Sequence, residues 1–216
     1  MNRIISVLSL LIIFILLVSA ASTNAQGLFL DRGRNGIRIS GTFSHGQGLY
    51  VIGGSFGISL AALIDLNLAI SRLKVIDFDA KFLTVAPQLT VYALKQTKLI
   101  PISMAASISY EIISANRSEG YNTSDIKSLN YGIALYRSFH LSEGGQFIPE
   151  VGIVYTDPMV KNSDLENITS FLIGFIYVAP GRTEKRIFVN PSILINKDNR
   201  VVNIALGMYL SKSSPR

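Results

Sequence analysis

Segments of about ten residues in which apolar and polar side chains alternate recur along most of this chain. A period of two places successive side chains on opposite faces of a β-strand. In a soluble protein the apolar face turns to a core, whereas in a membrane barrel it turns to lipid and the polar face lines the lumen. In residues 36–44, GIRISGTFS, the apolar positions are Ile37, Ile39 and Phe43, and the polar positions are Arg38, Ser40, Thr42 and Ser44.

The first 25 residues have the features of a secretory signal peptide. Arg3 precedes a run over residues 4–18 whose only polar residues are two serines, and the small residues Thr23 and Ala25 follow it. This order predicts export and cleavage after Ala25. The run is about 15 residues long, shorter than the roughly 20 that a transmembrane helix needs. An uncleaved membrane anchor is the alternative. Residues 26–216 are then expected to form one domain.

The remaining chain is apolar without holding a second long apolar run. Hydrophobic residues make up 49% of the sequence, charged residues 16%, and the mean hydropathy is +0.38. Soluble domains carry about a quarter charged residues. The chain has no cysteine, which fits a bacterial envelope protein better than a eukaryotic secreted domain. These features predict an all-β fold, an antiparallel up-and-down transmembrane β-barrel.

The alternating segments predict about ten strands, with eight as the alternative number. The three longest expected connections, residues 73–79, 113–128 and 157–167, all fall at one end of such a barrel. Because outer-membrane barrels have short periplasmic turns and longer outside loops, that end is expected to face outward. The expected strands are 36–44, 49–60, 63–72, 80–94, 100–112, 129–140, 147–156, 168–178, 186–195 and 201–211.

The polar faces of these strands carry mainly small residues, which suit the inside of a narrow barrel. We therefore expect Ile37 and Phe43 to face lipid and Ser40 to face the lumen. A few charged and amide side chains share the inward positions, and we expect an interior ion pair among Arg38, Asp65 and Glu150. The expected polar network of the lumen comprises Arg38, Asp65, Asn67, Glu111, Asn130 and Glu150.

Aromatic residues on the apolar faces gather near the two ends of the strands, as membrane interfaces select. One expected belt comprises Phe43, Tyr50, Tyr110, Tyr131, Tyr155 and Phe171, and the other Phe139, Phe147 and Tyr177. Tyr92 and Tyr209 fall on inward positions and do not fit these belts.

With its signal peptide, hairpin periodicity and aromatic belts, the chain resembles the small outer-membrane β-barrels of Gram-negative bacteria, the broad OmpA/OmpX-like class. The resemblance implies a place in the cell outer membrane, insertion by the barrel-assembly machinery, and contact with outer-membrane lipid and lipopolysaccharide. One departure concerns the end of the chain. Such proteins usually end on an aromatic residue, whereas this chain continues past Tyr209 to SKSSPR.

Two short patterns resemble parts of outer-membrane enzymes. Asp77 and Asp79 resemble one half of the omptin protease site. The other half of that site is an Asp-x-His pair, which does not occur in this sequence. His140 and Ser142 have the spacing found in the outer-membrane lipid A deacylase, where an Asn follows the serine; here it is Glu143. A serine nucleophile needs a neighbouring base and an oxyanion donor. We therefore expect no catalytic site.

No metal-ligand cluster or nucleotide-binding glycine motif occurs, so no cofactor is expected. The net charge of +6 does not predict nucleic-acid binding, because an exported barrel does not meet nucleic acid. The favoured function is a non-enzymatic outer-membrane barrel with a mostly closed lumen and a structural or surface-interaction role. Loop 113–128 is the expected contact surface for an extracellular partner. The alternatives are a narrow passive pore and a soluble periplasmic ligand-binding β-barrel.

Overall fold

The computed structural model describes residues 35–46, 48–76, 80–97, 99–115, 125–142, 144–159, 166–181 and 185–211. In this part of the chain all regular elements are β-strands, and no helix could span a membrane. The expected signal peptide lies outside the described residues. The strands are β1 (Gly36–Gly46), β2 (Leu49–Leu60), β3 (Ile64–Val75), β4 (Ala80–Leu94), β5 (Ser103–Ala115), β6 (Ile126–Tyr136), β7 (Phe139–His140), β8 (Gln146–Pro158), β9 (Ile168–Val178), β10 (Lys185–Ile195) and β11 (Arg200–Ser211).

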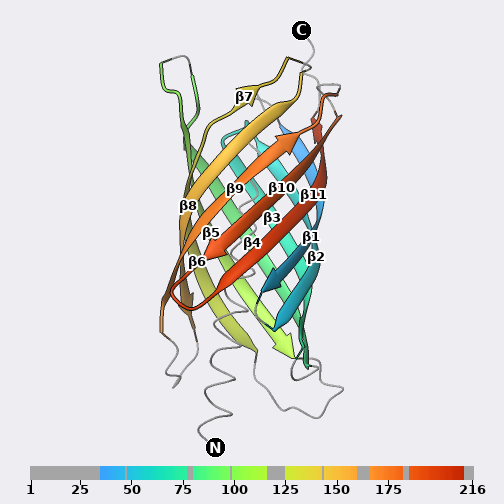
Figure 1. Cartoon of the computed structure of the whole chain (residues 1–216), viewed down its shortest axis with the longest axis vertical. Coiled ribbons are helices and arrows are strands. Elements are labelled where there is room, and N and C mark those ends of the chain that lie inside the picture. Colours follow the sequence, from blue (N-terminus) through green and yellow to red (C-terminus); the bar gives the residue numbers. More distant parts are fainter. Residues whose placement is uncertain are drawn as a thin grey trace, which may run out of the picture.

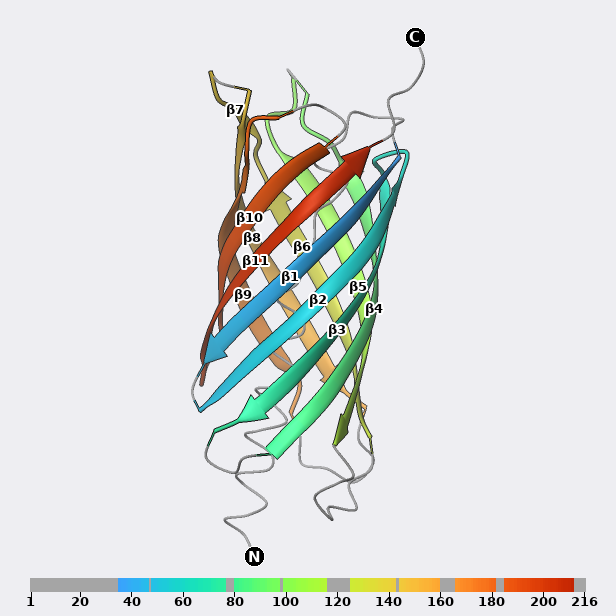
Figure 2. The same cartoon turned by 90° about the vertical axis from the view of Figure 1, so that its right-hand side faces the viewer.

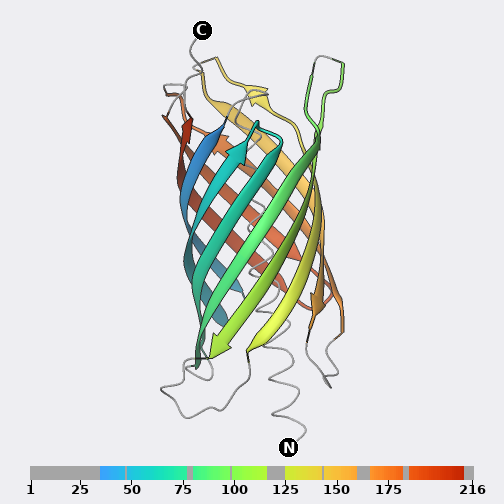
Figure 3. The same ribbon diagram turned by 180° about the vertical axis from the view of Figure 1, so that it is seen from behind.

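The strands form one closed antiparallel barrel. Each strand pairs with the next along the chain except β6, which pairs with β8 instead of the short β7. The first strand pairs with the last from Gly36↔Ser211 to His45↔Val202. Figures 1 and 3 show from opposite sides that strands surround the long axis, and Figure 2 shows β11, β1, β2 and β3 side by side and strongly tilted. The predicted up-and-down barrel of ten strands is confirmed, with β7 as a short addition.

The two ends of the barrel differ in which segments they hold. We call the end where β1 begins and β11 finishes the terminal rim, and the opposite end, with the β1–β2 turn, the distal rim. The expectation that the longest connections all lie at one end is wrong. Residues 116–125 and 159–167 connect strands at the distal rim, but the comparably long 95–102 and 137–145 lie at the terminal rim. The difference arises because strand pairing extends into segments expected as loops, including Leu73 and Ile113, which bury their side chains inside.

The segment expected as one strand over residues 129–140 is divided into β6 and β7. Both pieces pair with β8 in the same register, through Tyr136↔Glu150 and Phe139↔Phe147. The residue of β8 that faces the break is Pro149, which has no N–H to donate to the ladder. The expected single strand is therefore two strands in one register, and the interruption comes from the proline on the partner strand.

Two other prolines interrupt pairing in the same one-sided way. Pro87 pairs with Leu68 of β3, but the β4–β5 ladder lacks its pairs at Ala86 and Pro87 and resumes in the same register. Pro191 pairs with Ile204 of β11, but the β9–β10 ladder lacks its pairs at Asn190 and Pro191 and resumes in the same register. A proline in a closed sheet therefore removes hydrogen bonds toward one neighbouring strand and leaves the other ladder intact.

The direction in which the strands face follows from which side chains are buried. In β1, Ile37, Ile39 and Phe43 are exposed on the outer surface, whereas Arg38 and Ser40 are buried inside. The same alternation of exposed apolar and buried small or polar residues continues around the barrel. The soluble alternative requires the apolar face to point inward, and this arrangement contradicts it.

The aromatic side chains of the first expected belt all point outward at the distal part of the barrel. Tyr131 and Tyr155, on neighbouring strands, have ring centroids 6.4 Å apart. Near the terminal rim, the rings of Phe147 and Phe175 lie 5.2 Å apart. Tyr92 and Tyr209 are buried, so these two aromatics belong to the interior, as their positions in the alternation indicated.

Replacing the outward-facing Leu68 by arginine should impair the barrel. Leu68 lies in the middle of β3 and is 43% exposed on the outer surface. A charge at the bilayer midplane costs a transmembrane barrel roughly 2–4 kcal/mol. Leu68→Arg should therefore lower the urea midpoint of unfolding in lipid vesicles, whereas Ala69→Ser, on the inner face, should leave it unchanged. Equal midpoints for Leu68→Arg and the wild type would contradict a lipid-facing position.

Candidate functional site: the polar lumen

The inner face of the barrel is divided along its length. An apolar group, here called the distal apolar cluster, lies toward the distal rim, and a second, the terminal apolar cluster, lies toward the terminal rim. Polar side chains occupy the rest of the inner face. The distal cluster comprises Leu49, Val51, Leu73, Val75, Ile113, Val154, Ile168, Leu172, Leu194 and Val201, with Phe82 and Ile126 against it. The terminal cluster comprises Tyr92, Ala105, Ala134, Tyr136, Ile148, Ile176, Val178 and Phe188.

The guanidinium of Arg38 links three strands on one side of the lumen. Its Nη2 donates to Ser55 Oγ of β2 at 3.1 Å and to Asn67 Oδ1 of β3 at 3.0 Å. The hydroxyl groups of Ser40 and Ser55 lie 2.7 Å apart. Arg38 is only 1% exposed, so these contacts stabilise a charge held away from bulk water.

Asp65 supplies the negative charge on the same side of the lumen. Tyr92 Oη of β4 donates to Asp65 Oδ2 at 2.7 Å, and the Asp65 carboxylate attracts Arg38 electrostatically. Three of the sequence-predicted residues, Arg38, Asp65 and Asn67, therefore lie together in one group that spans β1 to β4. Opposite charges of this kind tolerate burial better than either charge alone.

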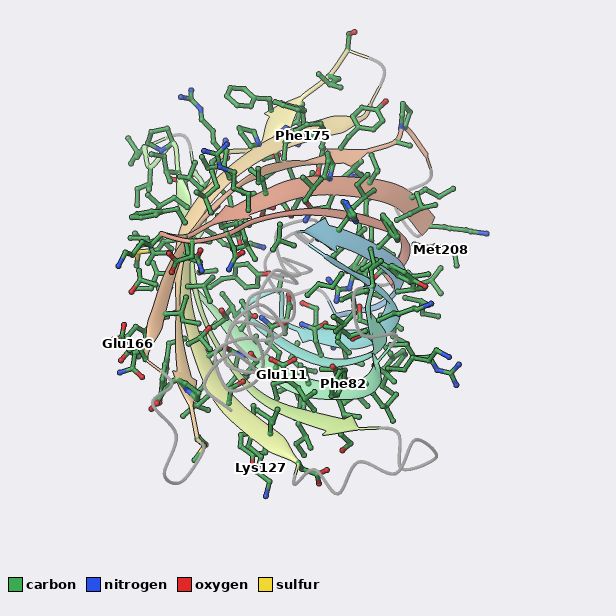
Figure 4. All side chains as sticks on the ribbon, turned by 60° about the horizontal axis from the view of Figure 1, so that its bottom comes forward. Phe82, Glu111, Lys127, Glu166, Phe175 and Met208 are labelled. Carbon is green, nitrogen blue, oxygen red and sulfur yellow. The ribbon has the colours of Figure 1, made fainter. Side chains whose placement is uncertain are left out.

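Glu111 and Asn130 form a second group on β5 and β6, nearer the distal rim. Ser128 Oγ donates to Glu111 Oε2 at 3.4 Å, and Asn130 Nδ2 donates to Ser109 Oγ at 3.4 Å. Figure 4 shows Glu111 inside the barrel wall together with Phe82, whereas Lys127 and Glu166 lie at its periphery. The Glu111 carboxylate therefore accepts from an uncharged hydroxyl group rather than from a cation.

Glu150 belongs to a third group that compensates for a proline. When the amide of Asn190 is oriented to face its acceptors, Nδ2 donates to the Phe175 carbonyl at 3.2 Å and to Glu150 Oε1 at 3.1 Å. Phe175 lies at the break in the β9–β10 ladder, where Pro191 has no N–H to offer. The Asn190 side chain therefore replaces a missing backbone donor and positions the carboxylate of Glu150 at the same time.

The six predicted residues are thus all buried on the inner face, but in three groups on different strands. Glu150 lies across the barrel from the Arg38 group, and its observed partner is Asn190 rather than Arg38. Sequence analysis did not name Ser55, Ser128 or Asn190 as partners. The alternation of the sequence does place these three residues on the inner face of the barrel. It does not give their position along the barrel axis, which decides which side chains meet.

Among the described residues, neither of the two enzyme-like patterns is completed by a catalytic partner. His140 Nε2 lies 3.4 Å from Gln146 Nε2, and no hydrogen bond between His140 and Ser142 is present. Asp77, Asp79 and Glu143 lie outside the described residues. In the part of the chain that the structure covers, no three His, Cys, Asp or Glu side chains gather as metal ligands would.

No family model and no curated protein matches this sequence. Solved structures with a similar fold include the β domain of the Bordetella autotransporter BrkA, with a TM-score of 0.52 and 10% identity over 82% of this chain and 98% of that one. The translocator domain of the autotransporter NalP from Neisseria meningitidis gives a TM-score of 0.50 and 11% identity over 90% and 91%. The N-terminal β-barrel domain of Pseudomonas aeruginosa OprF aligns with a TM-score of 0.36 and 9% identity over 84% and 100%. The two autotransporter domains show that the chain has the fold of bacterial outer-membrane β-barrels.

Removing the Arg38 side chain should weaken the barrel more than removing a turn cation does. Arg38→Ala leaves Asn67 Oδ1 without its guanidinium donor and Asp65 without the nearby positive charge. The expected loss of stability is about 3 kcal/mol, seen as a lower thermal midpoint in detergent. Lys197→Ala, in the exposed β10–β11 turn, should change the midpoint little. Two variants that melt alike would remove the support for an interior charge network.

Removing the Asn190 amide should destabilise the β9–β10 pair. Asn190→Ala leaves the Phe175 carbonyl and Glu150 Oε1 without this donor, at an expected cost of about 1–3 kcal/mol. Ser192→Ala, two residues further along the same inner face, removes one 3.3 Å contact from Asn203 and is the matched control. Chemical denaturation in detergent should give a lower free energy of unfolding for Asn190→Ala than for Ser192→Ala. The reverse order would contradict the compensating role of the amide.

Proposed function

We propose that this protein is a non-enzymatic outer-membrane β-barrel with a mostly closed lumen and a structural or surface-interaction role. The outer face is apolar over the central part of every strand, which suits residence in a lipid bilayer. An exported chain of this kind is expected in the outer membrane of a Gram-negative cell, inserted there by the barrel-assembly machinery.

The observation that carries the closed lumen is the distal apolar cluster. Its side chains come from β2, β3, β5, β8, β9, β10 and β11 and pack together. A lumen that conducts ions is usually lined by polar groups, and an apolar constriction opposes hydration. The packed leucine, valine and isoleucine side chains therefore support a barrier to water and ions.

The polar lumen groups favour a structural role over catalysis. Arg38 donates hydrogen bonds to two uncharged side chains. The Glu111 carboxylate contacts a hydroxyl group and the Glu150 carboxylate contacts an amide group. The surface-interaction role is assigned to loop 113–128, of which residues 116–124 lie outside the described residues.

One observation favours the second candidate, a narrow passive pore. Inward positions in the middle of the barrel are occupied by small residues such as Ser107, Gly132, Gly152 and Gly174. Small side chains leave more of the cross-section to water than large ones do. The two candidates therefore differ in whether the distal apolar cluster blocks a path that the middle of the lumen would otherwise provide.

Planar bilayer recordings separate these two functions. The refolded wild-type barrel should give no steady conductance. Leu73→Ser combined with Leu172→Ser should give one, because both residues belong to the distal apolar cluster and come from opposite sides of the barrel. Polar side chains at both positions remove the apolar barrier.

The matched control is Leu66→Ser with Leu206→Ser, two outward-facing leucines, which should remain silent. A steady wild-type conductance would favour the pore. A silent inner-face double variant that still folds, judged by its altered gel migration before boiling, would contradict the role given to the distal apolar cluster.

A further inference from the structure

Four polar side chains form a square on the inner face of β5 and β6. In the register of these strands, Ser109 lies opposite Asn130, and Glu111 lies opposite Ser128. Opposed residues on one face have Cβ atoms about 4.5–5.5 Å apart, and residues two apart along a strand lie about 7 Å apart. Glu111, Ser128 and Asn130 are buried, and Ser109 is half-buried. We call these four residues the β5–β6 oxygen square.

Two acceptor oxygens of the square lack a donor. Ser128 Oγ donates to Glu111 Oε2 at 3.4 Å, and Asn130 Nδ2 donates to Ser109 Oγ at 3.4 Å. Both contacts are longer than the usual range of about 2.5–3.2 Å. Glu111 Oε1 and Asn130 Oδ1 are buried without a hydrogen-bond partner among the described residues. Since an unsatisfied buried acceptor is unfavourable, the square favours a ligand that is positively charged or donates a proton.

The strands around Glu111 present no basic side chain to it within the described residues. From β4, the register places Ala86 opposite Glu111. From β6, the polar groups beside its carboxylate are those of Ser128 and Asn130. Lys127, the neighbour of Ser128 in the chain, lies at the periphery of the barrel (Figure 4). A buried carboxylate in this setting needs either a bound cation or a proton to offset its charge.

We propose that the β5–β6 oxygen square binds one monovalent alkali cation. Glu111 supplies the charged ligand, and Asn130 Oδ1 and the hydroxyl oxygens of Ser109 and Ser128 supply neutral ones. Hard cations prefer oxygen ligands of this kind. The square has one negative charge, so a singly charged ion leaves the buried site neutral, whereas a divalent ion would leave an excess positive charge. A proton engages one or two of these oxygens, whereas an alkali cation engages all four side chains.

The position of the square in the lumen shields a bound ion on two sides. Toward the distal rim, the next inward pair is Ile113 and Ile126, which belong to or pack against the distal apolar cluster. An apolar layer of this kind opposes hydration. Thr156 of β8 lies opposite Asn130 and is 1% exposed, so a further hydroxyl group borders the square. The inference goes beyond the proposed function and does not depend on whether the lumen conducts.

Thermal unfolding of the refolded barrel in nonionic detergent tests the proposal. A ligand that binds only the folded state stabilises it, so sodium or potassium chloride should raise the midpoint above that in tetramethylammonium chloride at equal concentration. Above half-saturation the midpoint should rise by about 3 °C for each tenfold increase in the alkali cation. Tetramethylammonium has the same charge but is too large for the square. Equal midpoints in all three salts would overturn the proposal and assign a protonated carboxyl group to Glu111.

Substitutions connect the effect to the square. Glu111→Gln keeps the size of the side chain and should abolish the difference between the salts. Asn130→Ala should raise the half-saturating concentration about tenfold, the value of one contact with a charged group. The matched control, Glu150→Gln, removes another buried carboxylate, whose Oε1 accepts from the Asn190 amide, and should keep the difference.

The opposite results would overturn the proposal. These are a difference between the salts that persists in Glu111→Gln, or one that is lost equally in Glu150→Gln. Heat-dependent gel migration shows whether each variant folds. If Glu111→Gln does not fold, an unchanged half-saturating concentration in Asn130→Ala overturns the proposal.

Diffraction locates the ion directly. Thallium(I) is monovalent and scatters anomalously, so crystals grown with it should show a peak between Glu111 and Asn130. Peaks confined to other parts of the barrel would overturn the assignment to the square. Stronger stabilisation by calcium than by either alkali cation would overturn the assignment to a monovalent ion.

Discussion

Backbone hydrogen bonding in a medium without water is the constraint on which the rest of this structure depends. An unpaired N–H or C=O costs several kcal/mol in hydrocarbon, so a membrane-spanning sheet has to close on itself. The pairing of β1 with β11 meets that requirement. Closure then creates an inside and an outside, and the period-two alternation of each strand distributes polar and apolar side chains between them. Pro191 has no backbone N–H to donate, and the side-chain amide of Asn190 donates to the Phe175 carbonyl instead.

The inner face combines two kinds of packing in one narrow barrel. Apolar clusters lie toward both rims, and small polar residues together with three groups of charged or amide side chains occupy the rest of the inner face. The Arg38 group satisfies its charge with Asn67, Ser55 and the nearby Asp65, whereas Glu111 and Glu150 contact uncharged groups. The outer face has a corresponding division, since basic residues succeed aliphatic ones along β3.

Much of the fold could be predicted from the sequence, because alternation in a closed sheet depends only on neighbours along the chain. The bounds of β2, β4 and β9 agree with the expected segments, and the inward position of Arg38 follows from the pattern of residues 36–44. The level of a residue along the barrel depends on stagger between strands, which no single segment encodes. For that reason Glu150 was expected beside Arg38 but lies with Asn190. The break between β6 and β7 likewise depends on Pro149 of a different strand.

The three prolines have a mechanical consequence for the barrel as a whole. The ladders joining β10, β11, β1, β2, β3 and β4 are uninterrupted. The β4–β5 and β9–β10 ladders each have a break, and a further break separates the β6–β8 ladder from the β7–β8 ladder. Fewer cross-strand bonds resist shear and bending on that side. The wall therefore has a stiff half, which contains the seam where the chain closes, and a compliant half in which every second seam can yield to the curvature and thickness of the surrounding bilayer.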